Sequence, residues 1–215
     1  MRGTSTFRRF TCTFAMVLLV VSCSSGHGQS ESPEVGRPSG SATELARILS
    51  RSNDGDSIVF GSVEQIVRAS DVVVSGQIAG VESGRTFLGA GGRVVLRTAV
   101  ITLENVKALA GGSSHLEQDP VIEVYINEDD LESMKSILPL GESAIFFVSD
   151  YTKNGNSISN QVSGRTYLFP FQQGFLMDGA DGIVSVMGGI VLPAGFKNLD
   201  SISHAVQTSE YSLGK

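Results

Sequence analysis

The spacing of apolar residues along the chain predicts short helices near both ends of its folded part. Three segments have apolar residues at helical spacing, and we expect them to be short helices: 43–49, 63–69 and 199–206. Ser62 and Gln65 have the spacing of a capping box, which predicts that the second helix begins there. Asn127 is expected to cap a further short helix, with Asp129 and Asp130 in its first turn.

Between these helices the pattern predicts strands. From Asp71 the period becomes two, so Val72 and Val74 would face one side and Val73 and Ser75 the other, as in a half-buried strand. Further strands are expected at 93–106, 121–126, 144–148, 161–171, 175–177 and 183–187, with antiparallel pairing. Turns or loops are expected at Gly84–Gly92, Leu140–Glu142, Asn154–Gly155 and Asp178–Gly182. The apolar segment 144–148 has the composition of a central strand.

The first 22 residues have the order of parts of a secretory signal. Arg2, Arg8 and Arg9 form a basic region, and an unbroken apolar run covers Phe14–Val21. That run is much shorter than the roughly 20 apolar residues that a spanning helix needs. The pair Arg8–Arg9 is followed by Thr11 and Cys12, which does not favour a twin-arginine signal.

The segment Val20-Val21-Ser22-Cys23 resembles the lipobox of bacterial lipoproteins. The resemblance covers these four positions and the regions before them. It implies cleavage before Cys23, a diacylglycerol on the Cys23 thiol and fatty acyl chains such as palmitate on the new terminus. Two or more acyl chains give stable anchoring, whereas one is reversible. The alternative is a plain secretory signal in which Cys23 has no role.

The amino-acid composition divides the chain into three segments. We expect a signal peptide at 1–22, the lipidated cysteine and a disordered tether at 23–42, and one globular β-rich domain at 43–215, because Ser, Gly, Pro, Gln and Glu dominate the tether. The chain has two cysteines, Cys12 and Cys23, so the mature domain would have no disulfide. Removing 1–22 takes away three arginines and no acid, which changes 16 basic and 22 acidic residues to 13 and 22, a formal charge of −9. Such a charge disfavours a nucleic-acid partner.

The predicted strands, with a small helix before the fourth, are typical of a small antiparallel Greek-key barrel of the OB type. The chain from Ala69 to Val186 resembles an uncharacterised group of secreted bacterial β-domains that are OB-like, similar in outline to the barrel of metalloprotease inhibitors. The resemblance depends on segments of core and turn residues: Ala69–Gly76, Leu140–Phe147 and Gln173–Phe175. It implies a fold and no function. The inhibitors' metal-chelating N-terminal cysteine is not reproduced.

No catalytic or metal constellation emerges from the sequence, and no cofactor is expected. The histidines His27, His115 and His204 share no local motif and have no neighbouring cysteine, so a zinc site lacks ligands. The acids around Asp129 and in the Asp178–Gly182 turn lack the spacing of an EF-hand loop. Gly89–Gly92 precedes a strand and not a helix, which disfavours a phosphate loop. No Gly-x-Ser-x-Gly elbow occurs.

Alternating aromatic residues are the one candidate binding surface. Tyr167, Phe169 and Phe171 would project from one face around Pro170 and, if exposed, could bind a peptide or sugar ring. In a barrel such residues more often fill the core. Two hypotheses stay open for the function. The first is a non-enzymatic lipoprotein on the extracytoplasmic face of the cell membrane that binds an envelope protein, peptide or glycan, and the second is a lipid-anchored hydrolase whose site is assembled by the fold.

Overall fold

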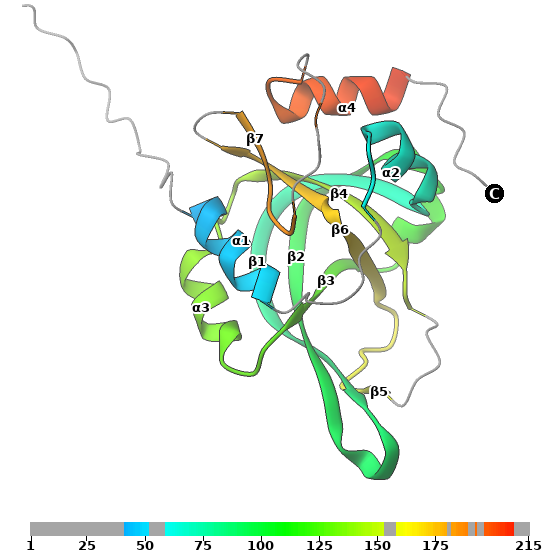
Figure 1. Cartoon of the computed structure of the whole chain (residues 1–215). Helices are drawn as coiled ribbons and strands as arrows, with labels where there is room; N and C mark the ends of the chain where they lie inside the picture. Colours follow the sequence, from blue (N-terminus) through cyan, green and yellow to red (C-terminus); the bar gives the residue numbers. More distant parts are fainter. Residues whose placement is uncertain are drawn as a thin grey trace, which may run out of the picture. The chain divides into compact units, whose positions relative to one another are not determined.

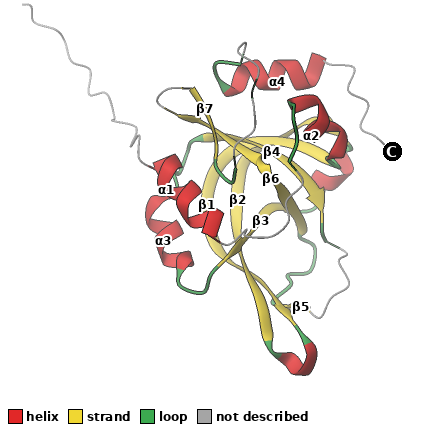
Figure 2. Cartoon of the chain, in the orientation of Figure 1, coloured by secondary structure: helices red, strands yellow, loops and turns green. Residues whose placement is uncertain are grey.

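A seven-stranded mixed sheet and four α-helices account for most of the described chain. The computed structural model describes residues 41–51, 59–152, 158–179, 182–188, 192 and 196–208. Its helices are α1 (Ser41–Arg51), α2 (Val63–Ala69), α3 (Asp130–Ile137) and α4 (Leu199–Thr208) (Figure 1). Its strands are β1 (Val72–Leu88), β2 (Val94–Gly111), β3 (Pro120–Ile126), β4 (Ser143–Asp150), β5 (Ile158–Ser159), β6 (Thr166–Gly179) and β7 (Gly182–Ser185). Figure 2 shows that strands predominate. The prediction of a mainly β fold with short helices is confirmed.

Strand pairing runs through the sheet and returns to its starting strand. β1 pairs with β2, β2 with β3, β3 with β6, β6 with β4, and β4 with β1. β5 pairs with β1, and β7 pairs with β6. All of these pairs are antiparallel except β3 with β6. The predicted antiparallel pairing is therefore present in every pair of described strands but one. The sheet is mixed because β3 and β6, which α3, β4 and β5 separate in the chain, run in the same direction.

Two apolar clusters stabilise the sheet from its two faces. The first core joins α1 and α3 to one face, through Leu45 and Met134 among others. The second core joins α2 and α4 to the other face of β1 and β4, through Ile66 and Ile202 among others. Figure 1 shows α1 beside α3, and the two helices are in contact. Because β4 lies between the two cores, its residues 144–148 are all buried, as predicted for a central strand.

The start of β1 is buried on both faces, which differs from the half-buried strand predicted from its alternation. Val72 and Val74 belong to the first core, as expected. Val73, on the opposite side of the strand, is fully buried in the second core. The period of two was read correctly, but the sequence of β1 does not reveal that α2 and α4 cover its second face.

The predicted glycine-rich loop Gly84–Gly92 was also wrong in its extent. β1 continues through Gly84 to Leu88 and pairs with β2 as far as Leu88 opposite Val94. Gly84 is buried, and a Cβ atom there would lie 2.3 Å from Thr98 Oγ1. This glycine therefore permits the close approach of β2, and only the short segment Gly89–Arg93 turns the chain.

The helix ends follow the predicted caps in one case and differ in another. The Ser62 side chain accepts a hydrogen bond from the Gln65 amide at 3.3 Å, which confirms the start of α2. Gln65 Oε1 in turn accepts from the Gly61 amide. At α3, by contrast, Asp129 occupies the N-cap position, and Asn127 donates its side-chain amide to the Asp130 carboxylate. Asn127 was thus misassigned as the cap, although the helix exists.

The remaining predicted turns and the last helix are present wherever the structure describes them. Gly141 has a φ of 81° and turns the chain into β4, and its amide donates to the Ile78 carbonyl. The predicted final hairpin is present as β6 and β7. The C-terminal helix is present as α4. The predicted Asn154–Gly155 turn lies outside the described residues. In the part of the chain that the structure describes, no helix has both the length and the apolarity to cross a bilayer.

Candidate functional site

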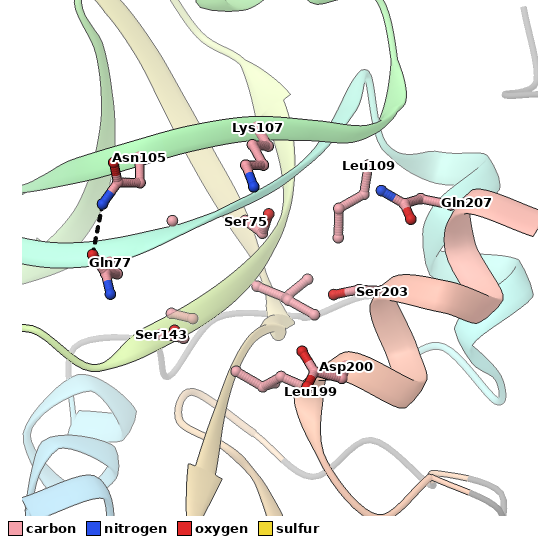
Figure 3. A pocket seen from close by; sticks show the side chains of 13 residues that line it. Ser75, Gln77, Asn105, Lys107, Leu109, Ser143, Leu199, Asp200, Ser203 and Gln207 are labelled. Carbon is pink, nitrogen blue, oxygen red and sulfur yellow. Dashed lines mark hydrogen bonds between the residues drawn. The ribbon is translucent and has the colours of Figure 1, made fainter.

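A cavity of about 480 Å³ lies between the sheet and α4, a volume typical of ligand sites (Figure 3). Strands β1, β2 and β4 form one wall, and α4 forms the other. Its polar side chains include Gln77, Asn105, Lys107, Asp200, Ser203 and Gln207. None of the described residues that line it is aromatic.

A bulge in β2 shapes the sheet wall. Ser75 pairs with Lys107 but Gln77 pairs with Glu104, so β2 has one extra residue at this point. Asn105 lies in the bulge with a φ of 53°, a conformation that asparagine adopts more readily than most residues. Its side-chain amide donates to Gln77 Oε1 at 2.7 Å (Figure 3). The bulge thereby places a paired set of amides at one end of the cavity.

The helix wall follows from the amphipathic pattern of α4. Leu199, Ile202 and Val206 pack in the second core. Asp200, Ser203 and Gln207 lie three and four residues apart and so share the neighbouring face of the helix. Figure 3 shows Ser203 and Gln207 directed from α4 towards the strands.

The β6–β7 hairpin holds the first turn of α4 in place. The Asp178 carboxylate accepts a hydrogen bond from the Leu199 amide at 3.0 Å. Asn198 Oδ1 accepts from the Ser201 amide at 3.0 Å. Asp178, considered above as a calcium ligand, therefore has a structural partner. These bonds fix Asp200 at the edge of the cavity.

Lys107 and Asp200 are the ionisable groups of this cavity. Lys107 comes from β2 and Asp200 from the first turn of α4, and both residues are exposed. Among the residues that the structure describes, neither forms an ion pair. Both charges are therefore exposed at the cavity without an ion-pair partner among the described residues.

Hydroxyl, amide and charged groups line the cavity. Serine hydroxyls from Ser75, Ser143 and Ser203 line it together with Lys107. Serine–lysine catalysis requires the amine to hydrogen bond the nucleophile, and no such bond joins these described groups. The described lining of the cavity therefore offers hydrogen-bond donors and acceptors with one charge of each sign.

His115 has an acidic partner elsewhere in the fold. Its Nδ1 lies 2.9 Å from Asp150 Oδ2 at the end of β4. Partial burial acts to raise the pKa of Asp150, but hydrogen bonds from Thr152 and His115 outweigh it and hold that pKa below its usual value. In the described region no hydroxyl group hydrogen bonds the other ring nitrogen, so a nucleophile for a triad is missing. The histidine–aspartate pair thus connects η2 (Ser113–Leu116) to β4.

The three aromatic residues proposed as a platform lie in different surroundings. Tyr167 is buried, with its ring 4.1 Å from Arg85 Cζ. Phe169 is half-buried and contacts Tyr125, with ring centroids 4.3 Å apart. Phe171 packs on Phe60 beside the second core. The fold therefore does not assemble one continuous platform from Tyr167, Phe169 and Phe171.

A buried ionic network beneath Tyr167 was not anticipated. The Arg85 and Glu123 side chains are fully buried, and Arg85 Nε donates to Glu123 Oε1 at 2.9 Å. Arg85 Nη2 also pairs with Glu123 Oε2. Thr98 Oγ1 lies 2.7 Å from Glu123 Oε1, and Arg85 Nη1 donates to the Tyr151 carbonyl at 3.2 Å. With these partners the network is internally satisfied, which indicates a structural role.

The remaining candidate residues lie apart from the cavity or outside the described residues. Cys23 and His27 fall outside the described residues. His204 lies on α4, and its carbonyl accepts from the Thr208 hydroxyl. Within the described residues, no group of three or more His, Cys, Asp or Glu side chains could hold a metal ion.

Comparison with models of known protein families and with curated protein sequences finds no match to this chain. The candidate site therefore depends on its own geometry.

Proposed function

We propose that this chain is a lipid-anchored protein of the extracytoplasmic face of a bacterial cell membrane, and that its folded part binds a peptide segment of another envelope component. Two features support the proposal. The segment ending at Cys23 has the order of a lipoprotein signal. The cavity beside α4 contains the exposed, unpaired Lys107 and Asp200, and this is the observation on which the binding role depends.

We also infer that β1, β2, β3, β6 and β4 form an OB-like barrel. Their pairings return to β1, and the parallel pair is β3 with β6. α3 lies between β3 and β4, as the small inserted helix does in folds of the OB type. On this interpretation the first core fills the barrel, and the cavity lies on its outer surface beside α4.

The lining of the cavity favours a peptide over a glycan. Side-chain amides from Gln77, Asn105 and Gln207 can pair with backbone N–H and C=O groups of an extended peptide. Lys107 and Asp200 can pair with charges of either sign on that peptide. Sugar rings are commonly recognised by stacking on aromatic faces, and the described lining has none. The acidity of the mature chain also disfavours nucleic acid.

Site-specific photo-crosslinking in intact cells tests the binding role. A benzophenone amino acid replaces Ser143 at the cavity, and a matched control replaces Leu140, which is 62% exposed and three residues away. We expect a peptide-containing adduct from position 143 that is lost in the Lys107→Ala and Asp200→Asn variants. Equal adducts from both positions, or none from position 143, would contradict the proposal.

A second reagent separates binding from hydrolysis. A fluorophosphonate that labels activated serines is applied to the same membranes. We expect no covalent label on the chain because no described hydroxyl in the cavity is hydrogen bonded to a base. A label on Ser75, Ser143 or Ser203 would favour the lipid-anchored hydrolase instead.

A further inference from the structure

The far end of the β1–β2 hairpin extends beyond its neighbouring strands. β3 pairs with β2 only from Arg97 onwards, and β5 pairs with β1 only at Thr86 and Phe87. Beyond these points the hairpin continues through Leu88 opposite Val94. Figure 1 shows this end of the hairpin projecting away from the other strands. We call residues 88–96 the hairpin tip.

The tip has aliphatic side chains at its surface. Val95 is 62% exposed and Val94 is 41% exposed. Leu88 and Leu96 are half-buried. Two of the exposed large apolar side chains of the described chain are therefore neighbours at the end of one hairpin.

The turn that closes the tip is compact. The Gly89 amide donates to the Arg93 carbonyl at 2.8 Å. Gly91 and Gly92 have φ values of 74° and 75°, which glycine adopts without strain. The turn therefore presents Val94 and Val95 on a paired β-ribbon and not on an irregular loop.

The net charge of the hairpin tip is opposite in sign to that of the whole chain. Its sequence, LGAGGRVVL, has no acidic residue, and its one charged residue is the exposed Arg93. The full chain has 22 acidic and 16 basic residues. Aliphatic side chains next to a cation suit the boundary of an anionic bilayer, where the apolar groups enter the acyl region and the cation pairs with lipid phosphate.

We propose that the hairpin tip is a membrane-contact element that inserts Val94 and Val95 into the bilayer to which Cys23 is anchored. The proposal builds on the proposed lipid anchor. The 18 residue-to-residue steps from Cys23 to Ser41 span at most about 65 Å when fully extended. This exceeds the diameter of about 40 Å expected for a folded domain of about 170 residues. The anchor therefore allows the tip to reach the same membrane.

A second copy of the chain fits the tip less well. The tip offers four aliphatic side chains, Leu88, Val94, Val95 and Leu96, whereas a stable protein interface uses about 20–30 residues a side. A bilayer needs no such area because the acyl chains supply the affinity and the tip only orients the domain.

A fluorescent label at the tip tests the contact. Val95→Cys would be the one free thiol of the lipidated mature chain, because Cys12 is removed and the Cys23 thiol is acylated. The full mature chain is labelled with an environment-sensitive dye and reconstituted in vesicles of zwitterionic and anionic lipid. The matched control is Leu140→Cys, with the same 62% exposure as Val95. We expect a shift to shorter wavelength and quenching by acyl-chain quenchers at position 95 only.

Three other results would overturn the membrane contact or separate it from the anchor. Water-like emission at both positions contradicts the contact. A shift at position 95 that appears without vesicles and grows with protein concentration contradicts it too, in favour of self-association. If mass analysis finds dye on Cys23, the anchor has failed. The Cys23→Ser chain is then labelled and held on vesicles by an N-terminal histidine tag and a nickel-chelating lipid, where a shift supports the tip contact and water-like emission overturns it.

A charge reversal provides the second variant. Arg93→Glu is expected to lower the quenching at position 95 about fivefold or more on anionic vesicles, and little on zwitterionic ones. The control is Arg68→Glu on α2, whose side chain is 59% exposed. Equal losses from the two substitutions, or no loss from Arg93→Glu, would contradict the role of the tip.

Discussion

Two pairs of charged residues, Arg85 with Glu123 inside the fold and Lys107 with Asp200 at the cavity, differ in what surrounds them. Arg85 and Glu123 are fully buried, bonded to each other and completed by Thr98 and Tyr151. Lys107 and Asp200 are exposed at a cavity and have no ion-pair partner among the described residues. The charged atoms of Arg85 and Glu123 therefore have hydrogen-bond partners within the protein, whereas Lys107 and Asp200 have no ion-pair partner among the described residues. The comparison indicates that the first supports the fold and the second is available to a ligand.

Removing one member of the buried pair is expected to have the largest effect. Glu123→Ala leaves Arg85 buried without its partner, which should lower the free energy of unfolding by about 3–5 kcal/mol. Urea denaturation measures this. The double variant Arg85→Met/Glu123→Leu removes both charges and should recover most of the loss. A Glu123→Ala loss below about 1 kcal/mol would remove the distinction between the two pairs.

A smaller destabilisation is expected from Gly84→Ala. The new methyl group would meet Thr98 Oγ1 at 2.3 Å, and this oxygen is held by the Arg85 carbonyl and Glu123. Overpacking of this kind costs about 1–3 kcal/mol. Gly80→Ala is the control because its Cβ would lie 3.2 Å from Thr102 Oγ1. Thermal unfolding should give a lower midpoint temperature for Gly84→Ala than for Gly80→Ala. The reverse order would show that Thr98 and its partners move at little cost to accommodate the new methyl group.

In burial, the His115–Asp150 pair lies between the buried Arg85–Glu123 pair and the exposed cavity residues, since both of its side chains are a little under one-third exposed. The pKa of Asp150 is held below its usual value, so its ionised form stabilises the fold above the unfolded pKa of about 3.9, and this contribution is lost as pH falls through the lower folded pKa. We expect Asp150→Asn to cost less than about 1 kcal/mol at pH 7, after allowance for solvent screening. The difference from wild type should shrink below about pH 3. A difference that is constant down to pH 2 would contradict the pKa direction.

The smallest effect on stability is expected at the cavity. Lys107→Ala and Asp200→Asn remove exposed groups without ion pairs, so the free energy of unfolding should change by no more than about 0.5 kcal/mol. The same variants should abolish the crosslink from position 143. If they destabilised the protein as strongly as Glu123→Ala, the cavity charges would be structural and the contrast between the pairs would disappear.

Local patterns in the sequence predicted the elements well. The stripe of Leu45, Ile48 and Leu49 and the cap at Ser62 depend on residues close in the chain, and both predictions are confirmed. Gly84 was misjudged because its role depends on Thr98, which reaches it only through strand pairing.

The site was less predictable for the same reason. Its walls come from β1, β2, β4 and α4, and no short motif links them. The one available signal was the polar face of the last helix, where Asp200, Ser203 and Gln207 follow helical spacing beside the apolar stripe. Arg85 and Glu123 are 38 residues apart, and their partnership depends on neighbouring strands.

The most direct test of the account is the intact mass of the mature chain purified from the membranes of its native host. Because the proposed location depends on acylation of one sulfur atom, we expect a chain that begins at Cys23 and has the added mass of two or three acyl chains. A mature chain with an unmodified thiol at Cys23, or one that begins at another residue, would contradict the proposed anchor.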